Sequence, residues 1–284
     1  MNTGFTILAS GSKGNSILLV SEEAKVIIDA GLSTKALEAR LESIGVSMQE
    51  IDAILLTHEH HDHMSALPVL TKRYQIPICA NAETAKAIME KFKTPPQFKI
   101  FSTGETFSFK DLEIHPFSVQ HDCMDPVMFT IKTGQVKLGF CTDLGFVTTL
   151  VRHQLKNCDY LHIEANHRPS MVHACPRPMS YKQRVLGRSG HLSNEACGEL
   201  LREIAHPDLK KVFLAHLSQE CNHPDVALST VREILEKEGI ELELDIAHQD
   251  KVSTSVEFSP SSSNDCLIHA SSALDEGEII ENKR

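Results

Sequence analysis

The chain has 284 residues, of which 41% are hydrophobic and 23% charged, a composition typical of a globular protein with a sizeable core. Its net charge of −10, from 28 Lys and Arg against 38 Asp and Glu, disfavours binding of a polyanion by the surface as a whole. Eight scattered cysteines, no signal-peptide leader and no apolar run of membrane-spanning length lead us to expect a cytoplasmic protein without membrane contact.

The first part of the chain alternates predicted strands and helices. Short apolar runs separated by turn residues predict three strands, at residues 5–9, 17–20 and 26–28. A helix begins after Ser33, which caps it, and ends at Gly45. A buried strand at 53–56 follows, and then a helix at about 65–74 with Pro68 in its first turn.

The rest of the chain is richer in strand. Strands are predicted at residues 78–80, 106–109, 112–119, 127–131, 136–141, 160–163, 211–215 and 240–246. Helices are predicted near residues 83–92, 146–155, 193–205 and 224–237. From residue 253 onwards the sequence is rich in serine and carries scattered acidic residues, which is typical of a disordered segment. We therefore predict one folded domain over residues 1–252 and a disordered acidic tail over residues 253–284.

A stretch of reversed charge interrupts the acidic sequence between Ala165 and Asn194. It contains no Asp or Glu but five Arg or Lys residues, together with His167, His173 and His191. Such a basic island in an acidic protein predicts a local surface that binds phosphate. The alternative is a solvated face that balances acidic residues elsewhere, and composition alone favours neither interpretation.

The most informative segment follows the predicted strand at 53–56 and reads THEHHDH at residues 57–63. Its side chains converge on a cleft, because the segment begins at the carboxyl end of a buried strand. Imidazole suits zinc, iron and manganese, and carboxylate suits a harder ion, so the mixed set predicts a site for two metal ions. The internal position excludes an expression tag as the source of these histidines.

The pattern His-x-His-x-Asp-His after a hydrophobic strand is the signature of the metallo-β-lactamase superfamily, and residues 58–63 match it at every position. The other motifs of the family occur in the family's order along the chain. They resemble the Asp-x-Gly element at Asp29, the third motif at His121, the bridging aspartate at Asp143 and the last ligand at His216. The resemblance spans roughly residues 5–246 and implies an α/β fold, the αββα sandwich of two mixed β-sheets flanked by helices.

Carried over residue by residue, the resemblance implies two divalent metal ions, with zinc, manganese and iron as the candidates. One ion would be held by His58, His60 and His121, and the other by Asp62, His63 and His216. Asp143 and a hydroxide would bridge the ions, and Asp29 would support a ligand histidine from behind. Such a pair activates water and stabilises charge on a phosphoryl or acyl oxygen, so a hydrolase is implied.

Two features favour a phosphodiester substrate. The segment GHLSN at 190–194 resembles the Gly-His-Ser segment of transfer-RNA 3′-processing nucleases, in which the histidine protonates the leaving oxygen or contacts the scissile phosphate. His191 also lies close to a predicted helix N-terminus at Ser193, which is a suitable place for an anion. The second feature is the basic island just before this segment, which could grip a nucleic-acid backbone.

The overall resemblance is to the YycJ (WalJ)-like branch of bacterial metallo-hydrolases, and it is carried by LASGSKGNS at 8–16, EANH at 164–167, GHLSN at 190–194, and HLS at 216–218 with Asn222. Members are regarded as nucleases, which implies a 5′-to-3′ exonuclease on double-stranded DNA, with the bridging hydroxide as nucleophile and Asp62 and His191 as catalytic residues. Arg168 stands where the family usually has an acidic residue. The expected substrate-binding residues are Lys13, Asn15, His167, Arg184, Ser193, Asn194 and Asn222.

Three alternatives remain open at this point. The first is a phosphodiesterase that processes RNA or a small molecule. The second is a thioester hydrolase like glyoxalase II, which would need neither His191 nor the basic island. The third is a binding module that has lost its metals, which the intact set of expected ligands disfavours. The sequence decides neither the metal nor the oligomeric state.

Overall fold

Two β-sheets form the centre of the molecule in the computed structural model, which describes residues 2–92 and 96–258. The strands of the first sheet lie in the spatial order β14 (Val256–Glu257), β1 (Gly4–Ala9), β2 (Ser16–Val20), β3 (Lys25–Ile28), β4 (Ala53–Leu55), β5 (Ile78–Ala80) and β6 (Phe98–Ile100). Those of the second lie in the order β13 (Leu244–Ile246), β12 (Lys211–Ala215), β11 (Tyr160–Glu164), β10 (Val136–Cys141), β9 (Val127–Thr133), β8 (Leu112–Ser118) and β7 (Phe107–Phe109).

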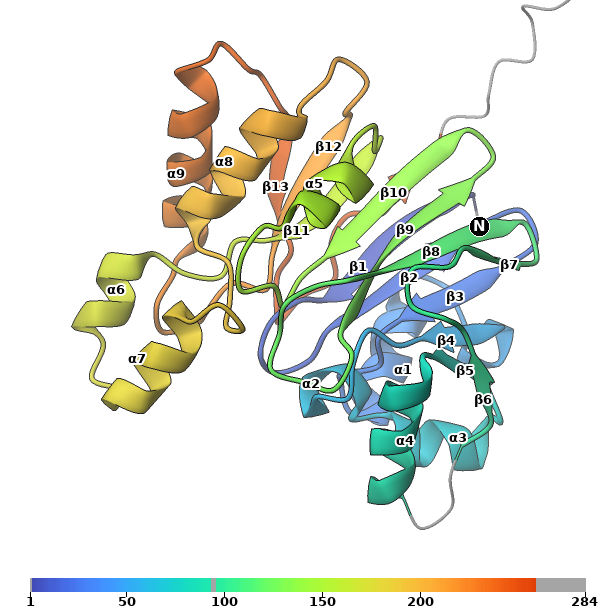
Figure 1. The fold of residues 1–284 in the computed structure, drawn as a ribbon. Helices are drawn as coiled ribbons and strands as arrows, with labels where there is room; N and C mark the ends of the chain where they lie inside the picture. Colours follow the sequence, from blue (N-terminus) through green and yellow to red (C-terminus); the bar gives the residue numbers. More distant parts are fainter. Residues whose placement is uncertain (1, 93–95, 259–284) are drawn as a thin grey trace, which may run out of the picture.

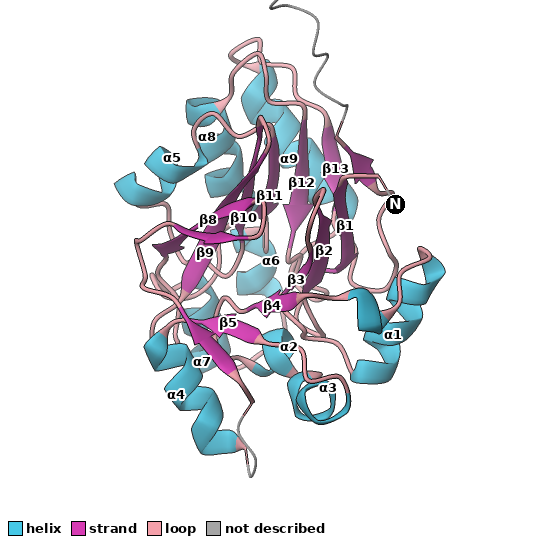
Figure 2. Ribbon diagram, turned by 90° about the vertical axis from the view of Figure 1, so that its right-hand side faces the viewer, coloured by secondary structure: helices cyan, strands magenta, loops and turns pink. Residues whose placement is uncertain are grey.

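Helices flank both sheets, with α5 and α8 on one side of the strands and α1 and α3 on the other (Figure 1 and Figure 2). The helices of the described residues are α1 (Thr34–Ser43), α2 (His61–Met64), α3 (Leu67–Arg73), α4 (Ala82–Lys91), α5 (Thr149–Leu155), α6 (Pro169–Ala174), α7 (Met179–Leu186), α8 (Asn194–Ile204) and α9 (Pro224–Glu236), with a short 3₁₀ turn at Met48–Glu50. This arrangement confirms the predicted αββα sandwich. Within the described part of the chain, no helix is both long and apolar enough to cross a membrane.

Each sheet is antiparallel on one side and parallel on the other. Strands β3 to β6 run parallel in the first sheet, and β10 to β13 run parallel in the second. Because parallel neighbours end at the same edge of a sheet, the loops after β3, β4, β10, β11 and β12 collect at the carboxyl ends of their strands. Loops at such an edge are where an α/β protein usually builds its site.

The two sheets are held together by a core of aromatic and branched side chains. The Phe5 ring packs edge-on against Phe140 and Phe213, with ring centroids 5.9 and 5.7 Å apart. Separate buried clusters join α1, α3 and α4 to the first sheet, and α5, α8 and α9 to the second. Strand β1 is buried along its whole length because it is covered on both faces.

Most elements lie where they were predicted, and the differences have local causes. The helix predicted at about 65–74 is α3, Leu67–Arg73, and the short helix α2 at His61–Met64 just before it was not predicted. Pro68 lies in the first turn of α3, as expected. The predicted strand at 240–246 shrinks to Leu244–Ile246. Strand β6 and helices α6 and α7, which are short, were not predicted.

The start of the predicted acidic tail belongs to the folded part. The Ser253 N–H donates to the Ile7 carbonyl, strand β14 pairs with β1, and Phe258 is buried. The fold therefore continues past the predicted boundary at residue 252, because these few residues extend the first sheet by one short strand. The rest of the predicted tail, residues 259–284, lies outside the described residues.

Candidate metal centre

Every residue expected to hold metal lies within a few positions of the carboxyl end of a strand. The motif at 57–63 follows β4, His121 follows β8, Asp143 follows β10 and His216 follows β12. Asp29, the expected supporting residue, follows β3. The two sheets thus bring together side chains that are far apart in the sequence.

Three of these residues have an unusual backbone. Asp29, Asp143 and His216 adopt positive φ angles of 59°, 51° and 53°, in the left-handed region that L-residues rarely enter. Each such residue costs about 1–2 kcal/mol relative to ordinary helical geometry. Strain of this kind persists where the surrounding fold enforces it, and it concentrates at functional sites.

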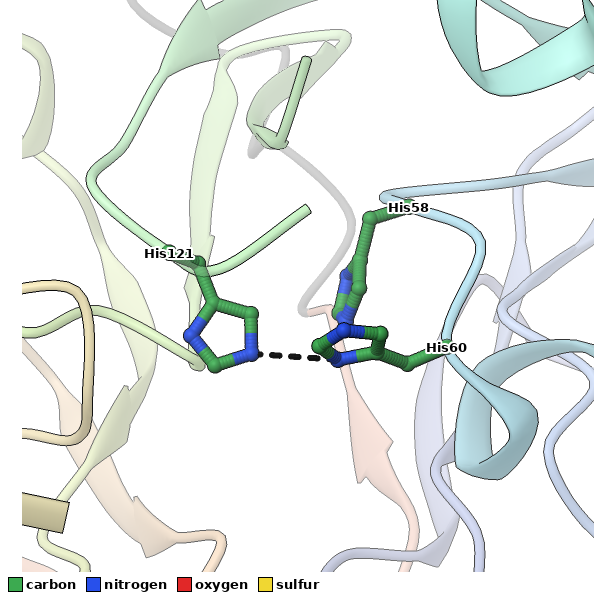
Figure 3. Close-up of side chains that lie close together, drawn as sticks. All are labelled: His58, His60 and His121. Carbon is green, nitrogen blue, oxygen red and sulfur yellow. Dashed lines mark hydrogen bonds between the residues drawn. The ribbon is translucent and has the colours of Figure 1, made fainter. Parts of the chain in front are cut away.

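The first group of donors consists of His58, His60 and His121, whose rings turn toward one another (Figure 3). The Nε2 atom of His121 lies 3.2 Å from the Nδ1 atom of His60. One ring nitrogen of each of the three lies within 4.8 Å of the others. His58 and His121 are buried and His60 is partly buried, so an ion between them would be largely shielded from solvent.

The opposite ring nitrogen of each histidine is held by a protein oxygen. His121 Nδ1 donates to the Gly190 carbonyl at 3.1 Å, and His60 Nε2 donates to the Asp122 carbonyl at 3.2 Å. His58 Nδ1 lies 2.9 Å from the hydroxyl of the preceding threonine. These bonds fix the tautomers, so the three facing nitrogens carry lone pairs that a metal can accept.

The second group of donors consists of Asp62, His63 and His216. The Oδ2 atom of Asp62 lies 3.7 Å from His63 Nε2 and 3.6 Å from His216 Nε2. His63 Nδ1 donates to Asp29 Oδ2 at 2.7 Å, which is the supporting role expected of Asp29. His216 Nδ1 faces Glu164 Oε1 at 3.0 Å. Again each histidine is held from behind and presents its Nε2 atom to the group.

Asp143 lies between the two groups. Its Oδ2 atom is 3.2 Å from His63 Nε2, and its Oδ1 atom is 3.7 Å from His121 Nε2 and 3.4 Å from His216 Nδ1. The side chain is almost fully buried. A carboxylate in this position can contact an ion in either group, as expected of a bridging ligand.

The donor set fits two divalent cations. Three buried polar atoms at the centre, His58 Nε2, His216 Nε2 and Asp143 Oδ2, have no hydrogen-bond partner within the described part of the chain. Such unsatisfied groups are rare in folded proteins and each costs about 1–3 kcal/mol. Imidazole nitrogens combined with carboxylate oxygens are the donors that zinc, manganese and iron take.

The pKa shifts of the histidines in the centre also favour the binding of cations. Burial lowers the pKa of His58 and of His121, so both are neutral and can donate a lone pair. Burial also opposes protonation of His63, but the carboxylates of Asp29 and Asp143 outweigh it and raise the pKa of this histidine well above its usual value. The carboxylates of the centre therefore attract positive charge, which divalent ions would supply when bound.

Glu164, at the end of β11, was not predicted to take part in the site. Its carboxylate is fully buried, and its Oε2 atom accepts from the N–H groups of Leu144 and Leu192 at 2.8 and 3.0 Å. Its Oε1 atom accepts from His191 Nδ1 at 2.8 Å and from His216 Nδ1 at 3.0 Å. One carboxylate thus orients both a metal-facing histidine and the expected proton donor.

These contacts keep Glu164 ionised. Burial raises its pKa, but His191 and His216 outweigh burial and lower the pKa of Glu164 to about 2. In return, although burial opposes it, Asp143 together with Asp62 and Glu164 raises the pKa of His216 to about 10. A signal for Glu164 was present in the sequence, since it opens the EANH segment directly after a buried strand.

The residues expected to bind substrate fall into two sets. Asn15 is at the centre, with its Nδ2 atom 3.0 Å from His63 Nε2 and 3.4 Å from Asp62 Oδ2. Arg184 is at the rim, where it makes a two-pronged ion pair with Asp122 at 2.6 and 3.2 Å. Lys13 is exposed, and its backbone N–H donates to Oε1 of the Gln249 side chain at 2.6 Å.

The other four expected residues join loops of the scaffold. Asn194 and Asn222 exchange two hydrogen bonds of 2.9 Å between their buried side chains. The Ser193 hydroxyl caps α8. His167 is buried, and burial lowers its pKa to about 4. Asn222 Nδ2 also donates to the Ala165 and Asn166 carbonyls, and among the described residues none of these four side chains is hydrogen-bonded to a donor of the centre.

Comparison with known proteins agrees with this geometry. A family model described as a beta-lactamase superfamily domain matches residues 24–217. Exodeoxyribonuclease YycJ of Bacillus anthracis is 34% identical over 84% of this chain and 91% of its own length. Exodeoxyribonuclease WalJ of Streptococcus pneumoniae is 36% identical over 80% of this chain and 86% of its own.

Solved structures extend the likeness to the fold. The metallo-beta-lactamase fold protein YhfI from Bacillus subtilis superimposes with a TM-score of 0.67 at 16% identity, covering 89% of this chain and 99% of that protein. At this identity the match bears on the fold alone. Taken with the sequence relatives and the matched domain, it shows that the chain belongs to the metallo-β-lactamase superfamily, as a hydrolase of its YycJ/WalJ branch.

Proposed function

We propose that the protein is a metal-dependent exodeoxyribonuclease that degrades double-stranded DNA from the 5′ end. The observation that carries the proposal is that the expected proton donor, His191, and its partner Glu164 lie beside the groups of side chains that would hold the metals. The His191–Glu164 pair lies directly beside the donors of both metals, with His191 Nδ1 3.7 Å from Asp143 Oδ1. Relatives named exodeoxyribonuclease that align over most of the chain support the choice of DNA.

Two divalent ions would be held by the two groups of donors, with Asp143 between them. When bound, such ions supply an activated water as the nucleophile and neutralise the charge that develops on the phosphate. The work of the protein is to hold the donors, to position the proton-transfer groups and to bind the polynucleotide.

We assign Asp62 as the group that orients the attacking water and takes its proton. Its side chain is 23% exposed, whereas that of Asp143 is 2% exposed, so Asp62 is the carboxylate that a substrate water reaches. The Asn15 amide donates to Asp62 Oδ2 at 3.4 Å and also to the Asp62 carbonyl at 3.4 Å. This contact limits the rotation of the carboxylate and keeps it facing the centre.

We assign His191 as the proton donor to the leaving oxygen. Its Nδ1–H is committed to Glu164, so its Nε2 atom is the one that faces substrate. The side chain is 14% exposed, so it can be reached from solvent. The buried Glu164 carboxylate accepts the Nδ1–H of the ring and so fixes its orientation, which a proton donor needs in every turnover.

The proposal is tested by degradation of duplex DNA labelled at the 5′ or the 3′ end, with manganese or zinc added. The wild type is expected to release label from the 5′ end first. Asp62→Ala should abolish activity, and His191→Gln should lower the rate by about a hundredfold or more while metal content is retained. His61→Ala is the matched control, because His61 lies inside the same motif but is exposed and outside both groups of donors.

Other outcomes would redirect the proposal. Loss of label from the 3′ end or internal cuts would contradict the stated polarity. Cleavage of RNA or of bis(p-nitrophenyl) phosphate without cleavage of DNA would leave a phosphodiesterase of another substrate class. Hydrolysis of a glutathione thioester with no phosphodiester cleavage would overturn the assignment altogether, because that reaction has no need of His191.

A further inference from the structure

Helices α6 and α7 project from the sandwich beside the metal centre (Figure 1). They pack against each other through a small hydrophobic cluster of Val172, Cys175, Val185 and Cys221, which is separate from the three large cores. We refer to residues 168–188, which contain both helices, as the basic lobe. The small core of this lobe is separate from the cores that hold the two sheets together.

The charge of the basic lobe is opposite to that of the chain. It holds five Arg or Lys residues and no carboxylate, in a chain whose net charge is −10. Two of the five are neutralised, Arg177 by Glu220 and Arg184 by Asp122. Arg168, Lys182 and Arg188 have no carboxylate partner among the described residues, and both arginines are exposed. Uncompensated positive charge is therefore concentrated on this projection.

The basic lobe is connected directly to the metal centre. The chain leaving α7 reaches Gly190, whose carbonyl accepts from His121 Nδ1, and then His191. Arg184 forms an ion pair with Asp122, whose Oδ1 atom lies 3.4 Å from His121 Nε2. The lobe is thus joined to the centre through Asp122 and through the segment that carries Gly190 and His191, so its exposed cations lie on an element that leads directly into the site.

Arg188 is the cation that is most firmly placed. Its guanidinium carbon lies 4.1 Å from the centroid of the Phe146 ring, in the loop that follows Asp143. That loop packs backbone to backbone on the lobe, since a β-carbon at Gly145 would lie 2.1 Å from the Arg188 carbonyl oxygen. A guanidinium stacked on an aromatic ring keeps its planar fork of N–H groups free and oriented, which suits a phosphate oxygen pair.

We propose that the basic lobe binds the DNA backbone, with Arg188 and Arg168 contacting phosphates next to the scissile one. The inference rests on the proposed nuclease function and names its substrate-binding surface. An acidic protein repels DNA over most of its surface, so productive binding needs a local positive surface at the site. A merely solvated face would not need three unpaired cations beside a phosphate-cleaving centre.

The test is steady-state degradation of 5′-labelled duplex DNA by the metal-loaded protein over a series of salt concentrations. Arg188→Gln and Arg168→Gln should each raise KM by about fivefold with kcat nearly unchanged. Each should also reduce the slope of log(kcat/KM) against log salt by about one, because one phosphate contact is lost. Arg188→Lys keeps the charge and should restore most of the slope.

Two controls separate this inference from the proposed function. Lys132→Gln on β9 removes an exposed cation of the body and should leave both KM and the slope unchanged. Hydrolysis of bis(p-nitrophenyl) phosphate, which has no neighbouring phosphate, should be equal in all variants. That equality would also establish that the variants are folded.

Degradation of DNA with the same KM and slope in both arginine variants would overturn the role of the basic lobe and leave the nuclease standing. A wild type that cleaves the small ester but neither binds nor cleaves DNA would overturn both proposals. Tighter, lobe-dependent binding of RNA than of DNA would overturn the choice of DNA as the occupant of the lobe.

Discussion

Replacement of Glu164 by Gln tests whether one buried carboxylate organises both the metal-facing and the proton-donating histidines. Glu164 accepts four hydrogen bonds, two from backbone N–H groups at one oxygen and two from imidazole N–H groups at the other. An amide of the same shape has only one oxygen. Whichever way it is turned, its NH₂ group faces two donors, so two bonds are lost.

The size of the effect follows from those two bonds. A hydrogen bond to a charged group contributes about 1.5–3 kcal/mol, so we expect the free energy of unfolding to fall by about 3–6 kcal/mol. This is a large part of the ~5–15 kcal/mol that stabilises a typical domain. Urea unfolding of the chelated protein measures it, with Glu113→Gln as a control, since Glu113 is 54% exposed and its ion pair contributes little.

The catalytic consequence is measured on the metal-loaded protein. Without the carboxylate, the His191 ring loses its fixed tautomer, and we expect the rate on a small phosphodiester to fall by about a hundredfold. Because part of the effect of Glu164 is exerted through His191, the rate losses of the double variant with His191→Gln should be clearly less than additive; the part exerted through His216 remains. A stability loss below about 1 kcal/mol, or fully additive rate losses, would refute the role assigned to Glu164.

Three further outcomes follow from the site. Asp29→Ala removes the support of His63 and should weaken metal binding by about 10–100-fold, as measured by competition with a chelator. His167 has a folded pKa of about 4 against 6.5 when unfolded, so the folded state resists protonation and stability falls as the pH drops from 6.5 towards 4. Between pH 7 and pH 5 the free energy of unfolding of the wild type should therefore fall by about 2 kcal/mol more than that of His167→Gln. Urea unfolding of both proteins at both pH values measures this difference. Gly31→Ala should displace the loop that carries Asp62 and lower metal content, because the new β-carbon would lie 1.6 Å from the Asp62 carbonyl oxygen; full metal content would contradict this packing.

The grouping of these His and Asp side chains was predictable because its sequence signals are local. The four donors at 58–63 occupy one short segment after a strand, and the remaining donors each follow a recognisable strand in a fixed order. The sandwich was predictable for a similar reason, since short apolar runs separated by turn residues mark strands such as β2 and β12.

What could not be predicted depends on contacts between distant segments. The carboxylate of Glu164 meets His191 and His216, which are 27 and 52 residues away, only after β11 and β12 have paired. Strand β14 is two residues long and exists because it pairs with β1, at the other end of the described chain. Helices α6 and α7 lie in a segment rich in proline, where periodicity gave no signal.

The left-handed backbone of Asp29, Asp143 and His216 limits which donors this centre can ever use. Asp, Asn and His enter that region several-fold more readily than other side chains, and two of these three are proposed metal ligands. Glutamate and cysteine are also good metal ligands, but nothing in their side chains favours a positive φ. The backbone conformation thus restricts which residue types are favoured at these three positions. Evolution or engineering can exchange these positions among imidazole and short carboxylate donors, whereas a thiolate-rich centre with soft-metal preference would first require the strand ends to be rebuilt.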